Sequence, residues 1–349
     1  MKALVPSGGR GTRLRPITYT SAKQLVPVAG EPILDRVLRQ IADAGICECV
    51  LVVGDTADEI ERHVGDGERF GLAVRYVRQE EPRGLADCVR VARPLLGDEP
   101  FLMYLGDNML ADGVAGIVAA FRAEPVAAQI LTVRVEHPER FGVVTLDPDG
   151  AVLRVEEKPE APASDLALAG VYVFGPEVHP IIDGLEPSRR GELEITDAIQ
   201  GLLERGARVR AVEAAGWWKD TGRPEDLLDA NRLVLAGLAA PKVEGELESC
   251  AMSGPVVVGR DAHVVGGALI GPCVLGAGAR IRDAIIGPNA SVGAGCVVEG
   301  GRIEDSIVMD ECVIRDASLA GSLLGRGVHV AGRGSARLVV GDHGSVTLG

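Results

Sequence analysis

The chain of 349 residues is poor in aromatic side chains, which make up 3% of it, and residues 250–349 contain none. No apolar run reaches the ~18 residues that a membrane-spanning helix needs, and the first ten residues do not resemble a signal peptide. The seven cysteines form no CxxC pair and the six histidines no HxxxH pair, which argues against a disulfide framework or a zinc knuckle. These absences predict a cytoplasmic protein with reduced thiols and no membrane partner.

Negative charge dominates, since acidic residues outnumber basic ones and the formal net charge is −14. This balance excludes a general affinity for nucleic acid. The N-terminal segment is the exception, because no acid precedes Glu31 while five basic residues do: Lys2, Arg10, Arg13, Arg15 and Lys23. This charge pattern predicts that an anionic ligand binds at the N-terminal segment. Only five of the 36 basic residues are lysine, a bias typical of GC-rich coding, so a scattered surface arginine carries little weight.

The C-terminal hundred residues follow a six-residue period. Aliphatic residues recur at Val258, Val264 and Ile270, and again at Ile286, Val292 and Val298. Glycines follow many of them, at Gly259, Gly271, Gly276, Gly287 and Gly293. The period predicts a solenoid in which each hexad makes one strand and one corner, with glycine where a Cβ would clash. Three hexads close a turn of about eighteen residues, so about five turns fit.

The first 240 residues alternate strands with helices. Predicted strands are 3–5, 50–53, 74–77, 101–105 and 209–212, and predicted helices are 33–44, 57–63, 85–96, 195–204 and 224–238. Residues 143–155 predict a hairpin whose turn is Asp147-Pro148-Asp149-Gly150. The alternation predicts an α/β fold with a Rossmann-like, mostly parallel mixed sheet. Ligands then bind where strands end, in the loops after Val5, Val77 and Leu105.

The first of these loops is rich in glycine. Its sequence is Ser7-Gly8-Gly9-Arg10-Gly11-Thr12-Arg13-Leu14-Arg15-Pro16, which is neither a Walker A loop nor GxGxxG. An ordinary tight turn would explain the glycines alone. The added cations Arg13, Arg15 and Lys23, with no acid nearby, favour a loop whose backbone N–H groups approach phosphate oxygens.

Together with Ser21-Ala22-Lys23-Gln24-Leu25-Val26-Pro27-Val28, this loop resembles the sugar nucleotidyltransferases. Further matches follow in order: Gln79 with Gly84-Leu85-Ala86, Gly106-Asp107-Asn108, residues 138–143 (PERFGV), 156–159 (EEKP), 191–197 (GELEITD) and 217–222 (WWKDTG). The set is most similar to the glucose-1-phosphate thymidylyltransferases, and the C-terminal repeat resembles the left-handed hexapeptide β-helix of their long form, typical of antibiotic deoxysugar pathways. The change in composition near Ala239-Ala240-Pro241 divides the chain into a catalytic domain, 1–240, and a β-helix domain, 241–349, for which we expect a structural and homo-oligomerising role.

The resemblance implies dTTP and glucose-1-phosphate as substrates and Mg²⁺ as cofactor. It implies nucleotide contacts by Gly8, Gly9, Gly11, Thr12, Arg13, Lys23, Gln24, Gln79 and Gly84. It implies sugar-phosphate contacts by Asn108, Gly142, Glu157, Lys158 and Glu194. Asp107 and Asp220 would hold the metal, and the catalytic residues would be Arg13, Lys23, Asp107, Lys158 and Asp220.

Three other functions stay open. The chain could use UTP or another sugar phosphate, because a missing 5-methyl group is worth only about 1–3 kcal/mol in an apolar pocket. It could be a non-catalytic regulator that binds sugar nucleotides, although the residues that such proteins tend to lose are all present. Acyl transfer on the β-helix is remote: His263 and His329 are its only candidates, and no long loop covers an acyl carrier.

Overall fold

The computed structural model describes residues 1–349, and contacts within the chain divide these residues into two compact units. Unit 1 comprises Met1–Arg10 and Leu34–Asp220, and unit 2 comprises Gly11–Ile33 and Thr221–Gly349. No helix in either unit combines the length and the apolar character that crossing a membrane requires. The N-terminal segment singled out by its charge is thus shared between the units.

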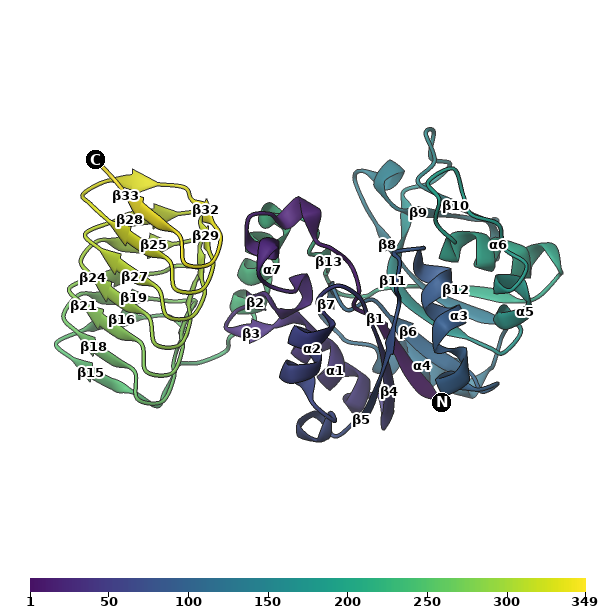
Figure 1. The fold of residues 1–349 in the computed structure, drawn as a ribbon, viewed down its shortest axis with the longest axis horizontal. Coiled ribbons are helices and arrows are strands. Elements are labelled where there is room, and N and C mark those ends of the chain that lie inside the picture. Colours follow the sequence, from purple (N-terminus) through teal and green to yellow (C-terminus); the bar gives the residue numbers. More distant parts are fainter. The chain divides into compact units, whose positions relative to one another are not determined.

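Unit 1 is built on a mixed nine-stranded sheet (Figure 1). Its strands are β1 (Lys2–Pro6), β4 (Glu48–Val53), β5 (Ala73–Arg78), β6 (Phe101–Tyr104), β8 (Ala128–Arg134), β9 (Gly142–Leu146), β10 (Val152–Glu157), β11 (Leu166–Phe174) and β12 (Val209–Glu213). The main path runs β10-β9-β11-β6-β1-β4-β5, and β8 joins β11 to β12. Strands β6, β1, β4 and β5 are parallel, whereas β11 is antiparallel to each of its neighbours.

Helices cover both faces of this sheet, as the alternating pattern predicts. They are α1 (Ile33–Asp43), α2 (Ala57–Val64), α3 (Leu85–Leu96), α4 (Ala115–Ala123), α5 (Val178–Ile182) and α6 (Ile195–Glu204). One core joins α3, α5 and α6 to side chains of the sheet, among them Ala128 and Ile130 of β8. Gln129 lies between those two residues and points to the opposite face, where its Nε2 donates to the carbonyl of Ile117 in α4 at 2.7 Å.

The predicted hairpin is confirmed in β9 and β10. The Asp147 carbonyl accepts the N–H of Gly150 at 3.0 Å, and its carboxylate accepts the N–H groups of Asp149 and Ala151. Asp147 also donates its own N–H to the Ala151 carbonyl at 2.9 Å, so its backbone and its side chain together close the turn. The sequence did not predict a two-stranded sheet of β7 (Asn108–Leu110) and β13 (Trp218–Asp220), because its strands are far apart in the chain.

Unit 2 contains a parallel β-solenoid of about six turns, drawn from green to yellow in Figure 1. The first solenoid sheet is β14 (Lys242–Val243), β17 (Val256–Val258), β20 (Cys273–Leu275), β23 (Ala290–Val292), β26 (Ile307–Val308), β29 (Leu323–Leu324) and β32 (Val339–Val340). The second is β15 (Glu246–Glu248), β18 (His263–Val265), β21 (Arg280–Arg282), β24 (Val297–Glu299), β27 (Val313–Arg315), β30 (His329–Ala331) and β33 (Ser345–Thr347). The third is β16 (Ala251–Ser253), β19 (Ala268–Ile270), β22 (Ile285–Ile286), β25 (Arg302–Glu304), β28 (Ser318–Ala320) and β31 (Ser335–Ala336).

The predicted coil of about eighteen residues and the predicted five turns are wrong. Val256 pairs with Cys273, so an early coil has 17 residues, whereas Val297 pairs with Val313, so a later coil has 16. One corner of each early coil and two corners of each later coil are thus one residue shorter than a full hexad. The shorter coils let about six turns fit into the same length of chain.

The inward positions carry the core. In the second solenoid sheet Val264, Ile281, Val298, Ile314 and Val330 stack in register, and each is at most 1% exposed. Complete burial of such a side chain contributes roughly 1.5–3 kcal/mol. The narrow interior accepts these β-branched side chains and leaves no room for rings, which explains why residues 250–349 lack aromatic residues.

Two further elements belong to unit 2. They are a hairpin of β2 (Pro27–Val28) and β3 (Glu31–Pro32) and the helix α7 (Pro224–Ala236), which ends two residues before its predicted end. The hairpin turns through Ala29 and Gly30, whose φ angles are 51° and 79°. Positive φ at both central residues is the type I′ pattern, which alanine adopts at a cost.

Substitutions at two neighbouring glycines distinguish the cost of a steric clash from the cost of backbone strain. A Cβ at Gly276 would lie 2.5 Å from the backbone nitrogen of Ala294 in the next coil, whereas Gly278 has φ +66° and open space around it. We expect Gly276→Ala to cost about 3 kcal/mol or more and Gly278→Ala only about 1–2 kcal/mol. Thermal unfolding of the full chain measures both, and equal midpoints for the two variants would contradict the proposed clash.

Candidate active site

The glycine-rich loop starts where β1 ends and lies against the neighbouring strand. Ser7 donates its N–H to the Val52 carbonyl at 2.7 Å, which continues the pairing of β1 with β4. A Cβ on Gly54 would lie 2.8 Å from the carbonyl oxygen of Gly8, so the two backbones touch here. Arg10 forms an exposed ion pair with Asp55 at 2.9 Å. Gly9 has open space around it, which leaves room for a ligand beside the loop.

In unit 2 the loop continues through three 3₁₀ turns, Thr12–Leu14, Ile17–Tyr19 and Lys23–Leu25. Gly11 has φ 58°, and a Cβ there would lie 3.2 Å from the Cβ of Lys23, so the first and third turns lie side by side. The hydroxyl of Thr18 donates to the Gly11 carbonyl at 2.6 Å and closes the segment. Arg13 is exposed and Lys23 is 6% exposed. Gln24 is buried, and its Oε1 lacks a hydrogen-bond partner.

Gln79 and Gly84, both predicted to contact the nucleotide, lie together in unit 1. Gln79 Nε2 donates to the Gly84 carbonyl at 3.2 Å and to the buried carboxylate of Asp87 at 2.7 Å. Gly84 has φ 99°, and a Cβ there would lie 2.5 Å from the carbonyl oxygen of Leu193. Only glycine therefore allows this approach between the start of α3 and the segment that precedes α6.

The two predicted metal ligands also belong to one unit. Asp107 immediately precedes β7, and Asp220 pairs with Asn108 in the β13–β7 ladder. The carbonyl of Pro6 accepts the N–H of Gly106 at 3.1 Å, so β1 holds this segment at its own end. Asn108 is 4% exposed, and its Oδ1 has no hydrogen-bond partner. Two carboxylates with a neighbouring amide oxygen are a donor set that suits a hard divalent cation.

Four of the five predicted sugar-phosphate residues, all except Asn108 on β7, gather around an arginine that the sequence analysis missed. Arg190 Nη1 lies 3.2 Å from Glu157 and 3.3 Å from Glu194. Lys158 Nζ lies 3.1 Å from Glu157, and a Cβ at Gly142 would be 3.5 Å from the same carboxylate. Arg190 directly precedes the GELEITD motif, but the arginine-rich composition had reduced its weight.

Two carboxyl groups in this cluster have raised pKa values. Burial raises the pKa of Glu194, and the nearby Glu157 raises it further, against the hydroxyl of Ser188, which donates to Glu194 at 2.9 Å. Burial also raises the pKa of Asp197, again with a contribution from Glu157. Lys158 has φ 43°, a left-handed conformation that costs of order 1–3 kcal/mol in a non-glycine residue. Strain of this kind is frequent at functional sites.

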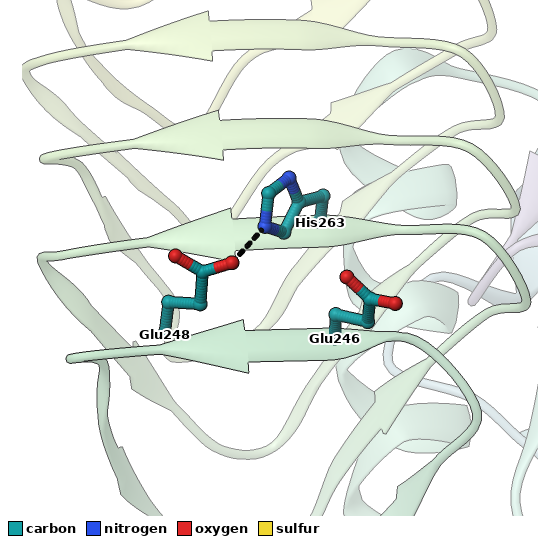
Figure 2. A group of neighbouring side chains, drawn as sticks. All are labelled: Glu246, Glu248 and His263. Carbon is teal, nitrogen blue, oxygen red and sulfur yellow. Dashed lines mark hydrogen bonds and ion pairs between the residues drawn. The ribbon is translucent and has the colours of Figure 1, made fainter.

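Another group of potential ligands lies on the solenoid. Figure 2 shows Glu246 and Glu248 of β15 beside His263 of β18, with their ligand atoms within 4.8 Å of one another. His263 Nε2 lies 2.8 Å from Glu248, and the register places Arg280 opposite His263 on the next strand. A cation here would meet a guanidinium group and exposed carboxylates without buried partners, so we assign no metal to this group. His329, the other histidine considered for acyl transfer, is exposed on β30.

Comparisons with known proteins agree with these features. The sequence model of the nucleotidyl transferase family matches residues 2–237. Two glucose-1-phosphate thymidylyltransferases, from Streptomyces antibioticus and Streptomyces griseus, are each 48% identical; the first alignment covers 100% of this chain and 99% of that protein, and the second 98% of each. A low-salt glycan biosynthesis nucleotidyltransferase of Haloferax volcanii is 42% identical over the full length of both chains.

Solved structures show the same fold for the N-terminal part. A crystal structure of a Bacillus anthracis protein assigned as a glucose-1-phosphate thymidylyltransferase, in complex with a sucrose, covers 69% of this chain and 98% of that one, with a TM-score of 0.64 and 32% identity. Members of this family generally use a divalent metal ion together with nucleotide and sugar-1-phosphate substrates. By sequence and by fold, the chain belongs to the nucleotidyl transferase family, among the sugar nucleotidyltransferases.

Proposed function

We propose that the chain transfers a thymidylyl group from dTTP to glucose-1-phosphate, giving dTDP-glucose and pyrophosphate for deoxysugar synthesis. The observation that carries this proposal is the cluster of Glu157, Lys158, Arg190 and Glu194, which offers both charge signs to a sugar phosphate. The names of the two full-length Streptomyces relatives support the choice of dTTP and glucose.

The chemistry demands cations rather than a base. The sugar phosphate is already an anion at neutral pH, so its oxygen attacks the α-phosphorus of dTTP without losing a proton to the protein. The bond from the α-phosphorus to the bridging oxygen breaks, and pyrophosphate leaves with that electron pair. Catalysis then consists of holding two polyanions in line and stabilising the charge that develops on the leaving group.

Each cation has a proposed task in this transfer. Arg13 binds the β- and γ-phosphates and stabilises the departing pyrophosphate. Lys23 contacts phosphate near the reacting centre, where its low exposure strengthens the interaction. Lys158 binds the phosphate of the sugar substrate, and the backbone at Gly8, Gly9, Gly11 and Thr12 shapes the loop under the triphosphate. Gln24, with its unpartnered Oε1, and Gln79 with Gly84 read the edge of the base.

Asp107 and Asp220 are proposed to hold the divalent ion, which we take to be Mg²⁺. Their carboxylates are hard oxygen donors, and the pairing of Asp220 with Asn108 brings the two backbones within one residue of each other. When bound, the ion supplies charge neutralisation at the phosphates. Asn108, Gly142, Glu157 and Glu194 are proposed to position the sugar hydroxyls.

We also propose that a domain boundary lies at residue 240, that the protein is cytoplasmic and that it forms a homo-oligomer.

Pyrophosphate release by the purified full chain tests the function. We expect fast release with dTTP, glucose-1-phosphate and Mg²⁺, slower release with UTP, and none in the presence of EDTA. Parallel reactions contain CTP, ATP or GTP, or a different sugar-1-phosphate. If no triphosphate gives pyrophosphate release while dTDP-glucose still binds, the result would favour a non-catalytic regulator instead.

The metal assignment predicts the effect of two conservative substitutions. Asp107→Asn and Asp220→Asn should each lower kcat by about 100-fold or more, because each removes one charged ligand at the reacting phosphates. Both variants should unfold at the wild-type temperature. Asp149→Asn, in the hairpin turn of unit 1, is the matched control and should keep full activity. Near-wild-type rates for both site variants at ordinary Mg²⁺ would contradict the assignment.

The raised pKa of Glu194 predicts a pH effect on sugar binding. The ionised carboxylate accepts hydrogen bonds from sugar hydroxyls, and its raised pKa means that protonation begins at a higher pH than for a glutamate at 4.5. We therefore expect the KM for glucose-1-phosphate to rise as the pH falls from about 7.5 to 5.

Glu194→Gln provides the control for titration of the substrate phosphate. The variant should have a higher KM at neutral pH but lack the additional rise, so the ratio of variant to wild-type KM should fall toward acid pH. A ratio that stays constant over this pH range would exclude Glu194 as the titrating group.

A further inference from the structure

The segment Gly11–Ile33 is anchored to the last coil of the solenoid. Asp342, which follows β32, accepts hydrogen bonds through its Oδ2 from the hydroxyls of Thr20 at 2.8 Å and Ser21 at 3.2 Å. Its Oδ1 accepts the N–H of Arg326 in the preceding coil at 2.8 Å, which fixes the orientation of the carboxylate. One solenoid side chain thus holds two consecutive hydroxyls of the segment, of which Ser21 is 2% exposed.

A second anchor holds the hairpin tip of the same segment. Asn231 of α7 is completely buried, and its Oδ1 accepts the N–H of Ala29 at 2.8 Å and the hydroxyl of Ser291 at 2.9 Å. Its Nδ2 donates to the carbonyl of Asn289 at 3.1 Å. A single amide therefore joins α7, the solenoid and the strained turn. Because Ala29 has φ 51°, its unfavourable conformation needs such external support.

Together the anchors hold the segment along the first solenoid sheet. Beside the hairpin tip, a Cβ at Gly30 would lie 3.2 Å from Val274 of β20, and at the other end a Cβ at Gly341, after β32, would lie 2.9 Å from the Pro16 carbonyl. Four strand spacings separate β20 from β32, which is about 19 Å. The anchored residues alternate along the chain with Arg13, Lys23 and Gln24, which we propose as nucleotide ligands.

We infer that the solenoid holds the nucleotide-binding segment in its working conformation and that Asp342 is a positioning residue for nucleotide binding. A segment of this kind loses conformational entropy for every residue that becomes ordered. Contacts with a rigid solenoid remove that cost before the nucleotide arrives, which raises affinity without any direct contact to the ligand. The inference rests on one part of the proposed function, namely that residues of this segment bind the nucleotide.

Variants on both sides of the contact test the inference in the full chain. Asp342→Ala removes the acceptor from the solenoid, and Thr20→Val with Ser21→Ala removes both donors without changing the solenoid. Asp342→Asn keeps groups that bond to the two hydroxyls and to Arg326, and it should largely restore wild-type behaviour. Arg337→Ala is the matched control, because it breaks an exposed ion pair between Arg337 of the solenoid and Glu225 of α7 that includes neither Asp342 nor any residue of the segment.

Two measurements read the result. Hydrogen exchange of peptides from residues 11–33 should become faster in Asp342→Ala and in the Thr20/Ser21 double variant, with an unchanged unfolding temperature. The dissociation constant for dTTP, measured by calorimetry, and its KM should rise about tenfold, which corresponds to about 1.4 kcal/mol. The KM for glucose-1-phosphate should stay near the wild-type value, and the control variant should match the wild type in every readout.

Specific outcomes would overturn the inference. Unchanged exchange in both variants would show that Asp342 does not hold the segment, whatever the activity. Faster exchange with unchanged dTTP affinity, or with equal losses for both substrates, would show that the contact does not position the nucleotide. A wild-type protein that binds dTTP but releases no pyrophosphate would contradict the proposed function alone, since exchange and calorimetry need no turnover.

Discussion

The parallel pairing of β1 with β4 and β6 is the constraint on which the candidate residues that follow these strands depend. Parallel strands that share a register end at one edge of the sheet, so whatever follows each strand meets there. The contact of Gly8 with Gly54 and the hydrogen bond from Gly106 to Pro6 are the direct result. These candidate residues share one edge because backbone pairing, rather than side-chain packing, brings their segments together.

The features that could be predicted from the sequence are those with a local period. The helix at residues 195–204 and the corner glycines of the solenoid follow from spacing alone, because each residue's environment depends on near neighbours in the chain. Coil length was misjudged because a residue missing from one or two corners of a turn hardly disturbs a six-residue pattern, although it shortens the whole coil. The β7–β13 sheet and the antiparallel course of β11 depend on pairing between distant segments. The periodicity of the sequence carries no information on such pairing.

The candidate site was predicted unevenly for a related reason. Motif residues such as Gln79 and Gly84 lie together as their order suggested, since both flank the same strand-to-helix connection. Arg190 was missed because its charge was one among many arginines and its partners Glu157 and Glu194 come from different elements. An arginine held by three carboxylates, those of Glu157, Glu192 and Glu194, becomes visible only when the fold has brought these elements together.

In the proposed function, the two sources of charge complement the two kinds of substrate. The N-terminal segment has cations without acids, which suits a triphosphate, whereas the cluster around Arg190 mixes acids with bases, which suits a sugar bearing both hydroxyls and a phosphate. The overall negative charge gives the chain no general affinity for polyanions, against which the acid-free cations of residues 1–30 stand out.

The anchoring of residues 11–33 on the solenoid also constrains how the chain can evolve. Thr20 and Ser21 lie more than 300 positions from Asp342 in the sequence, yet they share one carboxylate. Loss of both hydroxyls removes the reason to keep the acid, and loss of the acid leaves two hydroxyls without their acceptor. Substitutions at these positions should therefore be correlated among descendants of this chain. A recombination event that exchanged the solenoid alone would separate partners that had adapted to each other.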